Sequence, residues 1–253
     1  MSGESFQRYA RYYDLLYRDK DYAAEARFVD ALLRVDGGGP GELLEVGCGT
    51  GAHAREFAAL GWTVAGIDRS AEMIAIARAN TPAGVPITYG TGAAAEFSLG
   101  RTFAAAVALF HVMSYQAAPG ELERVLRNVR RHLGPGGRFA FDFWHGPGVR
   151  ADPPAIRVRR VHDGRIRATR IAEPRHDAEH RRVDVAYEVY LEDLVAGGIE
   201  RIEEVHRLRY FFLPELEAEL ERAGFAVETA RADLSLQPLH ETAWYGFVVA
   251  RAK

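Results

Sequence analysis

The sequence predicts an α/β fold, a doubly wound parallel sheet that carries an inserted antiparallel β-sheet. Three observations support this. Apolar runs alternate with amphipathic helical runs between residues 42 and 143, a pattern typical of parallel α/β sheets. A glycine-rich segment joins the first of these strands to a helix. Beyond residue 150 the alternation stops, and strand-like runs follow one another without helices between them.

Each element of the α/β part has its own signal. Helical spacing of apolar residues over 6–35 predicts one or two helices, which the glycine-rich run 36–41 ends. Ser70 is placed to cap a helix. In chain order, the predicted strands are 42–46, 62–67, 86–89, 103–110 and 138–143, and the predicted helices are 52–60, 71–80 and 121–133.

The inserted sheet is predicted from runs rich in Val, Ile, Arg and Tyr at 156–162, 165–173, 181–192 and 199–211. A helix at 213–223 and strands at 225–230 and 243–250 follow it. We therefore divide the chain into three parts with different expected roles. These are lid helices and cofactor-binding core at 1–149, an insert for substrate cover or dimerisation at 150–212, and completion of the core sheet at 213–253.

Composition narrows the classes of function. The net charge is −3, with 26% charged residues, so electrostatics give no reason to expect nucleic-acid or membrane binding. No apolar run is long enough for a membrane span, and the N-terminus lacks a secretory apolar region. The single cysteine, Cys48, excludes an intrachain disulfide and a cysteine-based zinc site. We expect a cytoplasmic protein without a metal ion.

The strongest functional signal is the loop after the first strand, with glycines at 47, 49 and 51. Glycine lets a ligand approach the backbone closely, and the following helix start offers unpaired N–H groups. Asp68 ends the next strand, where an acid can accept both hydroxyls of an adenosine ribose. Nicotinamide enzymes and adenosylmethionine enzymes share this chemistry, so these residues alone leave both open.

Further residues resemble class I S-adenosylmethionine-dependent methyltransferases. They are Glu45 before the glycines, Ser70 and Met73 after the acid, and a GPGG turn at 134–137. The resemblance implies a Rossmann-like seven-stranded sheet with an antiparallel last strand, S-adenosylmethionine as cofactor and S-adenosylhomocysteine as product. The cofactor-binding residues that it implies are Tyr13, Glu45, Gly47, Cys48, Gly49, Gly51, Asp68, Arg69, Met73, Ala93, Ala94 and Phe110.

Two positions depart from that family. Ala93 stands where an acid near the adenine is usual, and Ala104 where an Asp often precedes the fourth strand. Backbone N–H groups of Ala93 or Ala94 could still meet the adenine edge. These losses leave open a non-catalytic cofactor-binding protein, and a nicotinamide oxidoreductase is the weaker alternative.

The acceptor side is expected where the fourth and fifth strands end. Methyl transfer requires an aligned nucleophile and removal of its proton. Polar residues follow both strands, including Ser114, Gln116, Asp142 and Trp144. A lone loop histidine is more often a solvated or capping residue. The catalytic candidates are His111, Tyr115, Tyr13 and His145.

The N-terminal segment, FQRYARYYDLLY, resembles the lid of small-molecule methyltransferases, including sugar-nucleotide N-methyltransferases. In those enzymes the Tyr of a Tyr-Asp pair closes over the cofactor, which Tyr13 and Asp14 match, and Tyr115 falls near their proposed histidine base. The resemblance implies methyl transfer to N or O of a small-molecule acceptor, such as a nucleotide-linked amino sugar. The acceptor, the methylated atom and the oligomeric state, with a homodimer as one option, stay open.

Arginines are frequent between residues 150 and 182. Alternating arginines on strands usually form a solvated face, but they can also recognise the phosphates of an anionic substrate. In the second case, Arg157, Arg159 and Arg160 are expected to face the mouth of the cofactor cleft.

Overall fold

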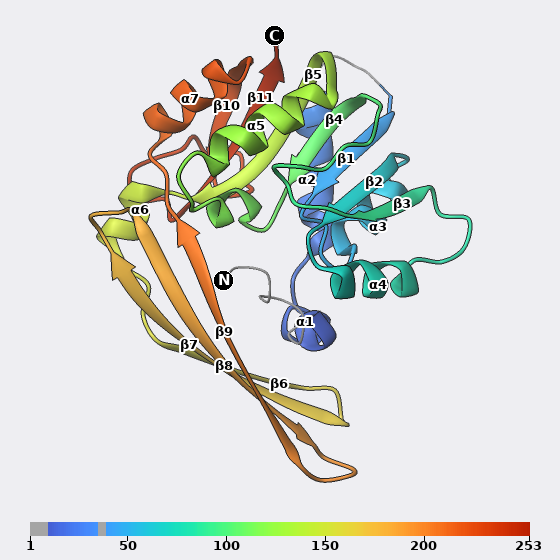
Figure 1. Cartoon of the computed structure of the whole chain (residues 1–253), viewed down its shortest axis with the longest axis vertical. Coiled ribbons are helices and arrows are strands. Elements are labelled where there is room, and N and C mark those ends of the chain that lie inside the picture. The colour runs from blue at the N-terminus through green and yellow to red at the C-terminus, as the bar shows by residue number, and fades with distance from the viewer. Residues whose placement is uncertain (1–9, 35–38) are drawn as a thin grey trace.

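The computed structural model describes residues 10–34 and 39–253. Its helices and strands form an α/β unit and a separate antiparallel sheet that extends from it (Figure 1). The start of the predicted N-terminal helix and part of the glycine-rich run at 36–41 lie outside the described residues. None of the helices in the described ranges is both long and apolar enough to cross a membrane.

The central sheet has seven strands in the order β10-β11-β5-β4-β1-β2-β3. Six run in the same direction, and β11 pairs antiparallel with both β5 and β10, which confirms the expected antiparallel last strand. In chain order the strands are β1 (Glu42–Val46), β2 (Thr63–Asp68), β3 (Ile87–Thr91), β4 (Phe103–Ala108), β5 (Leu133–Trp144), β10 (Phe225–Ala232) and β11 (Tyr245–Ala252).

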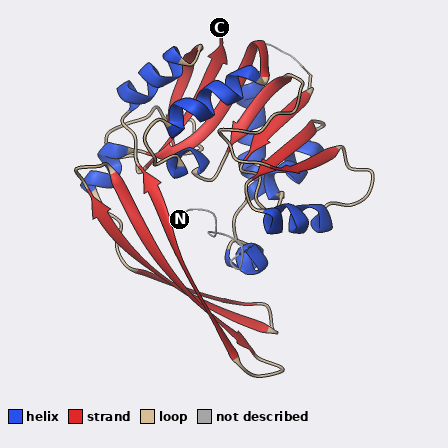
Figure 2. Ribbon diagram, viewed as in Figure 1, coloured by secondary structure: helices blue, strands red, loops and turns tan. Residues whose placement is uncertain are grey.

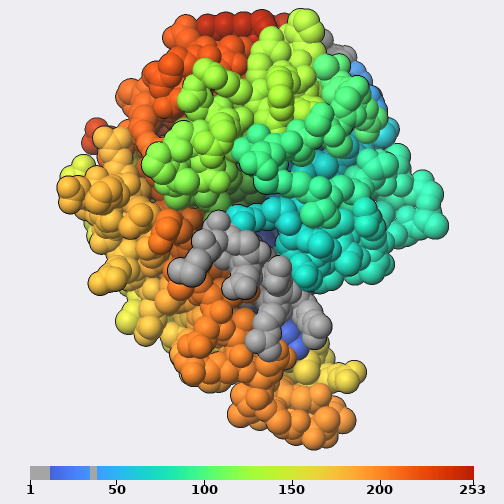
Figure 3. Space-filling view, viewed as in Figure 1, coloured from blue at the N-terminus to red at the C-terminus, as the bar shows by residue number. Residues whose placement is uncertain are grey.

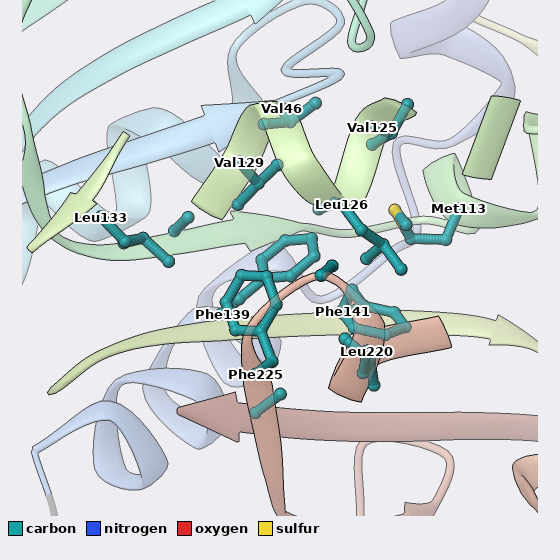
Figure 4. Close-up of a cluster of buried hydrophobic side chains, with 14 of the residues drawn as sticks. Val46, Met113, Val125, Leu126, Val129, Leu133, Phe139, Phe141, Leu220 and Phe225 are labelled. Carbon is teal, nitrogen blue, oxygen red and sulfur yellow. The ribbon is translucent and has the colours of Figure 1, made fainter. Parts of the chain in front are cut away.

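Helices cover both faces of this sheet (Figure 2). On one face, α5 (Glu121–Arg131) and α7 (Leu213–Arg222) pack against aromatic side chains of β5, as Figure 4 shows for Val125, Leu126, Phe139 and Phe141. On the other, α2 (Tyr22–Leu33) and α3 (Ala52–Ala59) bury Val29 and Phe57. The predicted helix after β2 is α4 (Ala71–Asn80), and Ser70 Oγ caps it by accepting from the Met73 N–H.

The second sheet has the order β6-β7-β8-β9, with every neighbouring pair antiparallel. Its strands are β6 (Arg157–His162), β7 (Ile166–Asp177), β8 (Arg182–Asp193) and β9 (Ile199–Arg209). Helix α1 (Ala10–Leu16), the predicted lid, packs on one face, where Leu16 shares a hydrophobic cluster with Val161, Ala168 and Val189. This face is called the inner face below.

The insert leaves and rejoins the core at neighbouring points. Phe211 N–H donates to the Trp144 carbonyl at 2.9 Å, and Gly146 N–H donates to the Phe211 carbonyl at 2.8 Å. The short helix α6 (Gly146–Ala151) leads into the insert. The sequence pattern missed this helix, because glycine and proline are weak helix formers.

The end of β4 also differs from prediction. The strand was expected to reach residue 110, but it ends at Ala108. Phe110 and His111 then have φ angles of 67° and 65°, left-handed values that side chains other than glycine seldom adopt. They turn the chain into a short 3₁₀ helix, η1 (Val112–Tyr115), so the residues after β4 lie beside the sheet edge instead of continuing the strand.

Candidate functional site

The glycine loop after β1 is held against the end of β2. The N–H groups of Gly47 and Cys48 donate to the Ile67 carbonyl at 2.7 and 3.1 Å. Gly49 has a φ of +53°, and apart from its chain neighbours a Cβ there would meet none of the described protein atoms within 4 Å. At Gly47 a Cβ would meet Val112. Gly47 is therefore required by internal packing, whereas Gly49 leaves open space that a ligand can occupy.

Asp68 joins this loop to the start of α4. Its Oδ2 accepts from Gly49 N–H and its Oδ1 from Ser70 N–H, both at 2.9 Å. Burial raises the pKa of the carboxyl, although these N–H groups oppose the shift. Each carboxylate oxygen can accept more than one hydrogen bond, so the fixed group is suited to bind a pair of neighbouring hydroxyls.

Glu45 lies beneath the loop at the end of β1 and is 2% exposed. Among the described residues, its Oε2 atom has no hydrogen-bond partner. Burial, reinforced by the nearby charge of Asp68, raises the pKa of Glu45 to about 8. The charge of Arg55 opposes this rise in pKa but does not outweigh it, so the buried acid is costly to ionise. The carboxyl therefore suits a ligand that brings its own positive charge.

We expect Glu45→Gln to be more stable than the wild type at pH 8, and by a larger margin than at pH 6. The unfolded chain ionises Glu45 near its ordinary pKa of 4.5, whereas the folded protein keeps the proton until about pH 8. Folding stability from this group is therefore lost as pH rises between these two values. Denaturant unfolding at both pH values measures the difference, with the exposed Glu96→Gln as control. Equal pH dependence of wild type and Glu45→Gln would contradict the shift.

The remaining expected cofactor residues follow strands β1, β2 and β3. Cys48 and Met73 are buried at 5% and 2% exposure. Arg69 and Ala93 are exposed, and Ala94 is half-buried. The Ala93 carbonyl accepts from Phe97 N–H in the turn after β3. By contrast, Ala104 lies at the amino end of β4, whereas the glycine loop follows the carboxyl end of the neighbouring parallel strand β1. The missing acid at position 104 is therefore remote from the site.

Helix α1 is hydrogen-bonded to the glycine loop. Asp14 accepts from Thr50 Oγ1 at 2.5 Å and from Asn80 Nδ2 at 3.0 Å. The ring of Tyr13 lies edge-on to Phe110, with centroids 6.3 Å apart. Tyr13 and Phe110 are thus brought together, whereas Tyr9 lies outside the described residues. Sequence reasoning paired Asp14 with Tyr13 but missed its contacts with Thr50 and Asn80.

The same helix and the residues after it also bind the insert. Tyr17 accepts from Arg170 Nη1 at 2.7 Å, and Asp19 pairs with Arg159 at 3.1 Å. In the space-filling view, the insert strands in orange lie below and to the left of the core segments in cyan (Figure 3). Helix α1 therefore spans from the glycine loop to the inner face of the insert.

His111 is fixed at the end of β4 by Asp142 of β5. Its N–H donates to Asp142 Oδ1 at 2.9 Å, and its Nδ1 lies 2.8 Å from Oδ2. The ring stacks on Tyr245 at 4.6 Å and 10°. Burial would raise the pKa of Asp142, but His111 outweighs burial and holds that pKa below its ordinary value. The structure thus brings together the ends of β4 and β5, as predicted.

Tyr115 contacts a residue that was not predicted from the sequence. Its hydroxyl forms a 2.8 Å hydrogen bond with His206 Nδ1, and His206 Nε2 binds Glu204 Oε2 at 3.0 Å. Both partners belong to β9. In the sequence, both residues lie in an alternating run of charged residues that is typical of a solvent-exposed strand. The pattern therefore gave no sign of a functional role.

His145 is also a catalytic candidate, but its contacts differ from those of His111 and Tyr115. It is 4% exposed, and its Nδ1 lies 3.0 Å from the Ala243 carbonyl. Burial lowers its pKa. Ser114 Oγ accepts from Trp144 N–H at 2.9 Å. These contacts join loops to the end of β5, so both side chains have clear structural tasks.

The arginines of the insert divide between its faces because neighbouring residues on a strand point to opposite sides. Arg159 pairs in register with Arg170, and Val161 with Ala168, so Arg157, Arg159 and Arg170 share the inner face. Arg160 is exposed on the opposite face. The expectation that Arg157, Arg159 and Arg160 face the cleft together is therefore wrong for Arg160.

Comparison with known proteins gives consistent matches. A family model described as a methyltransferase domain matches residues 43–137. A dTDP-3-amino-3,6-dideoxy-alpha-D-glucopyranose N,N-dimethyltransferase of Streptomyces fradiae is 34% identical, covering 87% of this chain and 84% of the relative.

Two solved structures share the fold. A sugar N-methyltransferase from a Streptoalloteichus species superposes with a TM-score of 0.80 at 29% identity, covering 95% of this chain and 92% of the other. An S-adenosylmethionine-bound amino pentose methyltransferase from Micromonospora echinaspora gives a TM-score of 0.74 at 25% identity, with 98% of both chains covered.

Proposed function

This chain belongs to the S-adenosylmethionine-dependent methyltransferases, and from that premise we propose that it methylates the amino group of a nucleotide-linked amino sugar. The observation that carries the proposal is the 34% identity, over 87% of the chain, to a dTDP-amino sugar N,N-dimethyltransferase. The second sheet supports it, because its inner face lies across α1 from the glycine loop and carries arginines.

The residues around the glycine loop fit S-adenosylmethionine. Gly49 leaves room for the ligand, Asp68 suits the ribose, and Glu45 suits a positive charge. When bound, the cofactor supplies a methyl group activated by its sulfonium. Tyr13 and Phe110 would close this side of the site, and Met73 is positioned on α4 to pack near the adenine.

The acceptor would bind between the strand ends and the insert. A small acceptor needs a second wall that excludes water and fixes its orientation. His111 is immobilised by Asp142 and Tyr245, so it would orient the acceptor beside the cofactor. Arg170, whose guanidinium also lies 5.1 Å from the Tyr187 ring, would pair with a phosphate of the nucleotide.

The test is turnover with a panel of nucleotide-linked sugars that carry an amino group, analysed by mass spectrometry for one or two added methyl groups. We expect N-methylated product. Methylation of only the hydroxyl analogues would overturn the amine assignment. Cofactor binding without turnover of any acceptor would instead favour the non-catalytic alternative.

In the same assay, Arg170→Ala should raise the acceptor KM about 10- to 100-fold, because a lost charge-assisted contact costs about 1.5–3 kcal/mol. Adenosylhomocysteine affinity should stay unchanged. Arg160→Ala on the opposite face is the matched control and should behave like the wild type. Equal KM values for the two variants would remove the phosphate role of Arg170.

A further inference from the structure

Three hydrogen-bonded side chains connect the insert to η1, the short 3₁₀ helix that follows β4. Tyr115 Oη lies 2.8 Å from His206 Nδ1, and His206 Nε2 lies 3.0 Å from Glu204 Oε2. The side chains of His206 and Glu204 are only 2% and 9% exposed. Burying a carboxylate and an imidazole costs free energy that apolar residues of similar volume would not, so this arrangement calls for an explanation beyond stability.

The position of these residues supplies one. Tyr115 is the last residue of η1, which begins directly after the left-handed turn at Phe110 and His111. The ring of Tyr187 from β8 meets His206 edge-on at 4.7 Å. Arg170 lies over that same ring and reaches the lid. The three side chains therefore lie where the core, the insert and the lid meet.

Their hydrogen bonds have one consistent direction. A carboxylate oxygen accepts hydrogen bonds, so in the arrangement that satisfies all three groups His206 Nε2 donates to Glu204 and His206 Nδ1 accepts. The Tyr115 hydroxyl then donates to Nδ1, and its oxygen can accept a hydrogen bond from a further donor. The same order of hydroxyl, imidazole and carboxylate activates nucleophiles in hydrolases.

We propose that Tyr115, His206 and Glu204 form the proton relay that makes the acceptor amine nucleophilic. This inference rests on the proposed N-methylation. The acceptor ammonium gives a proton to Tyr115 Oη as the phenolic proton passes to His206 Nδ1. One N–H bond and the phenolic O–H bond break, while a new phenolic O–H bond and an Nδ1–H bond form. The amine gains its lone pair, and Glu204 stabilises the imidazolium.

The relay predicts an activity loss that depends on pH. Tyr115→Phe, His206→Gln and Glu204→Gln should each lower kcat about 10²- to 10⁴-fold below the pKa of the free amine, the usual range for a lost proton-transfer group. As pH rises and the amine deprotonates in solution, the activity of the variants should approach that of the wild type. Calorimetric affinity for adenosylhomocysteine should be unchanged throughout.

Matched controls separate chemistry from packing. Tyr190→Phe removes a phenol that donates to Glu188 on the outer face of the insert, and His180→Gln removes an exposed imidazole paired with Asp177. Both should keep wild-type pH profiles. The titratable or charged groups that face His206 include Tyr115 from η1, Glu204 from its own strand and Tyr187 from β8, with Arg170 of β7 behind Tyr187.

The outcomes are distinguishable from failure of the proposed function. If the wild type methylates no amine, the function itself is wrong. If it does, a Tyr115→Phe or His206→Gln loss that persists unchanged at high pH would show a structural role and overturn the relay. Unchanged kcat in these two variants would overturn it as well.

Discussion

Gly49→Val should abolish saturable binding of S-adenosylmethionine and S-adenosylhomocysteine in calorimetry while the protein stays folded. Within the described ranges, an added Cβ at Gly49 would meet no atom within 4 Å apart from its chain neighbours, so a valine there would fill the space proposed for the ligand. Its φ of +53° adds strain of about 1–2 kcal/mol for a residue with a Cβ.

The control is a glycine-to-valine substitution that introduces the same backbone strain at a position away from the proposed ligand. Gly100 has a φ of +64° and open space around its Cβ position, in the loop before β4. Gly100→Val should lose comparable thermal stability yet bind the cofactor normally. If Gly49→Val also bound normally, the open space at the loop would not be the cofactor cradle.

Asp68→Ala should weaken cofactor affinity about 10- to 100-fold. Hydrogen bonds to a charged group contribute about 1.5–3 kcal/mol each, and about 1.4 kcal/mol corresponds to tenfold. Part of the loss would come from the loop, because Asp68 also accepts from Gly49 N–H. Asp68→Asn keeps one acceptor oxygen and should give an intermediate affinity by calorimetry.

The α4 start provides a control for that effect. Ser70→Ala removes the cap bond to Met73 N–H, which should cost about 1 kcal/mol of stability without a large change in affinity. A comparable affinity loss in Ser70→Ala would mean that Asp68 acts through the helix start. Unchanged affinity in Asp68→Ala would show that the carboxylate does not reach the ribose.

The α/β sheet was predictable because each of its signals is local. An apolar strand, a glycine loop and a cap such as Ser70 are each read from neighbouring residues, and most elements lie within a few residues of the predicted bounds. The exception is β5, which begins at Leu133 and includes the residues 134–137 that were expected to form a turn. Predictions were weaker at strand ends. The left-handed turn at Phe110 and His111 depends on packing around the sheet edge, and no residue type in the sequence demands it.

The juxtaposition of candidate site residues was predictable where they follow strands of the central sheet. Asp68 and Gly49 follow consecutive strands, so strand order alone brings them together. His206 and Glu204 reach Tyr115 through a sheet whose register no short motif encodes. The prediction for the arginines likewise required knowing which strand face meets α1, and alternation alone could not supply that.

The neighbouring ends of the insert make it exchangeable in evolution and in engineering. Because Trp144, Gly146 and Phe211 are joined by backbone hydrogen bonds, the segment between them can be replaced without shifting the register of β5 in the core. Insertions are tolerated where the two chain ends lie close together. If the insert holds the acceptor as proposed, a new segment changes acceptor preference on a constant methyl-donor scaffold, provided that it again matches Tyr17 and Asp19.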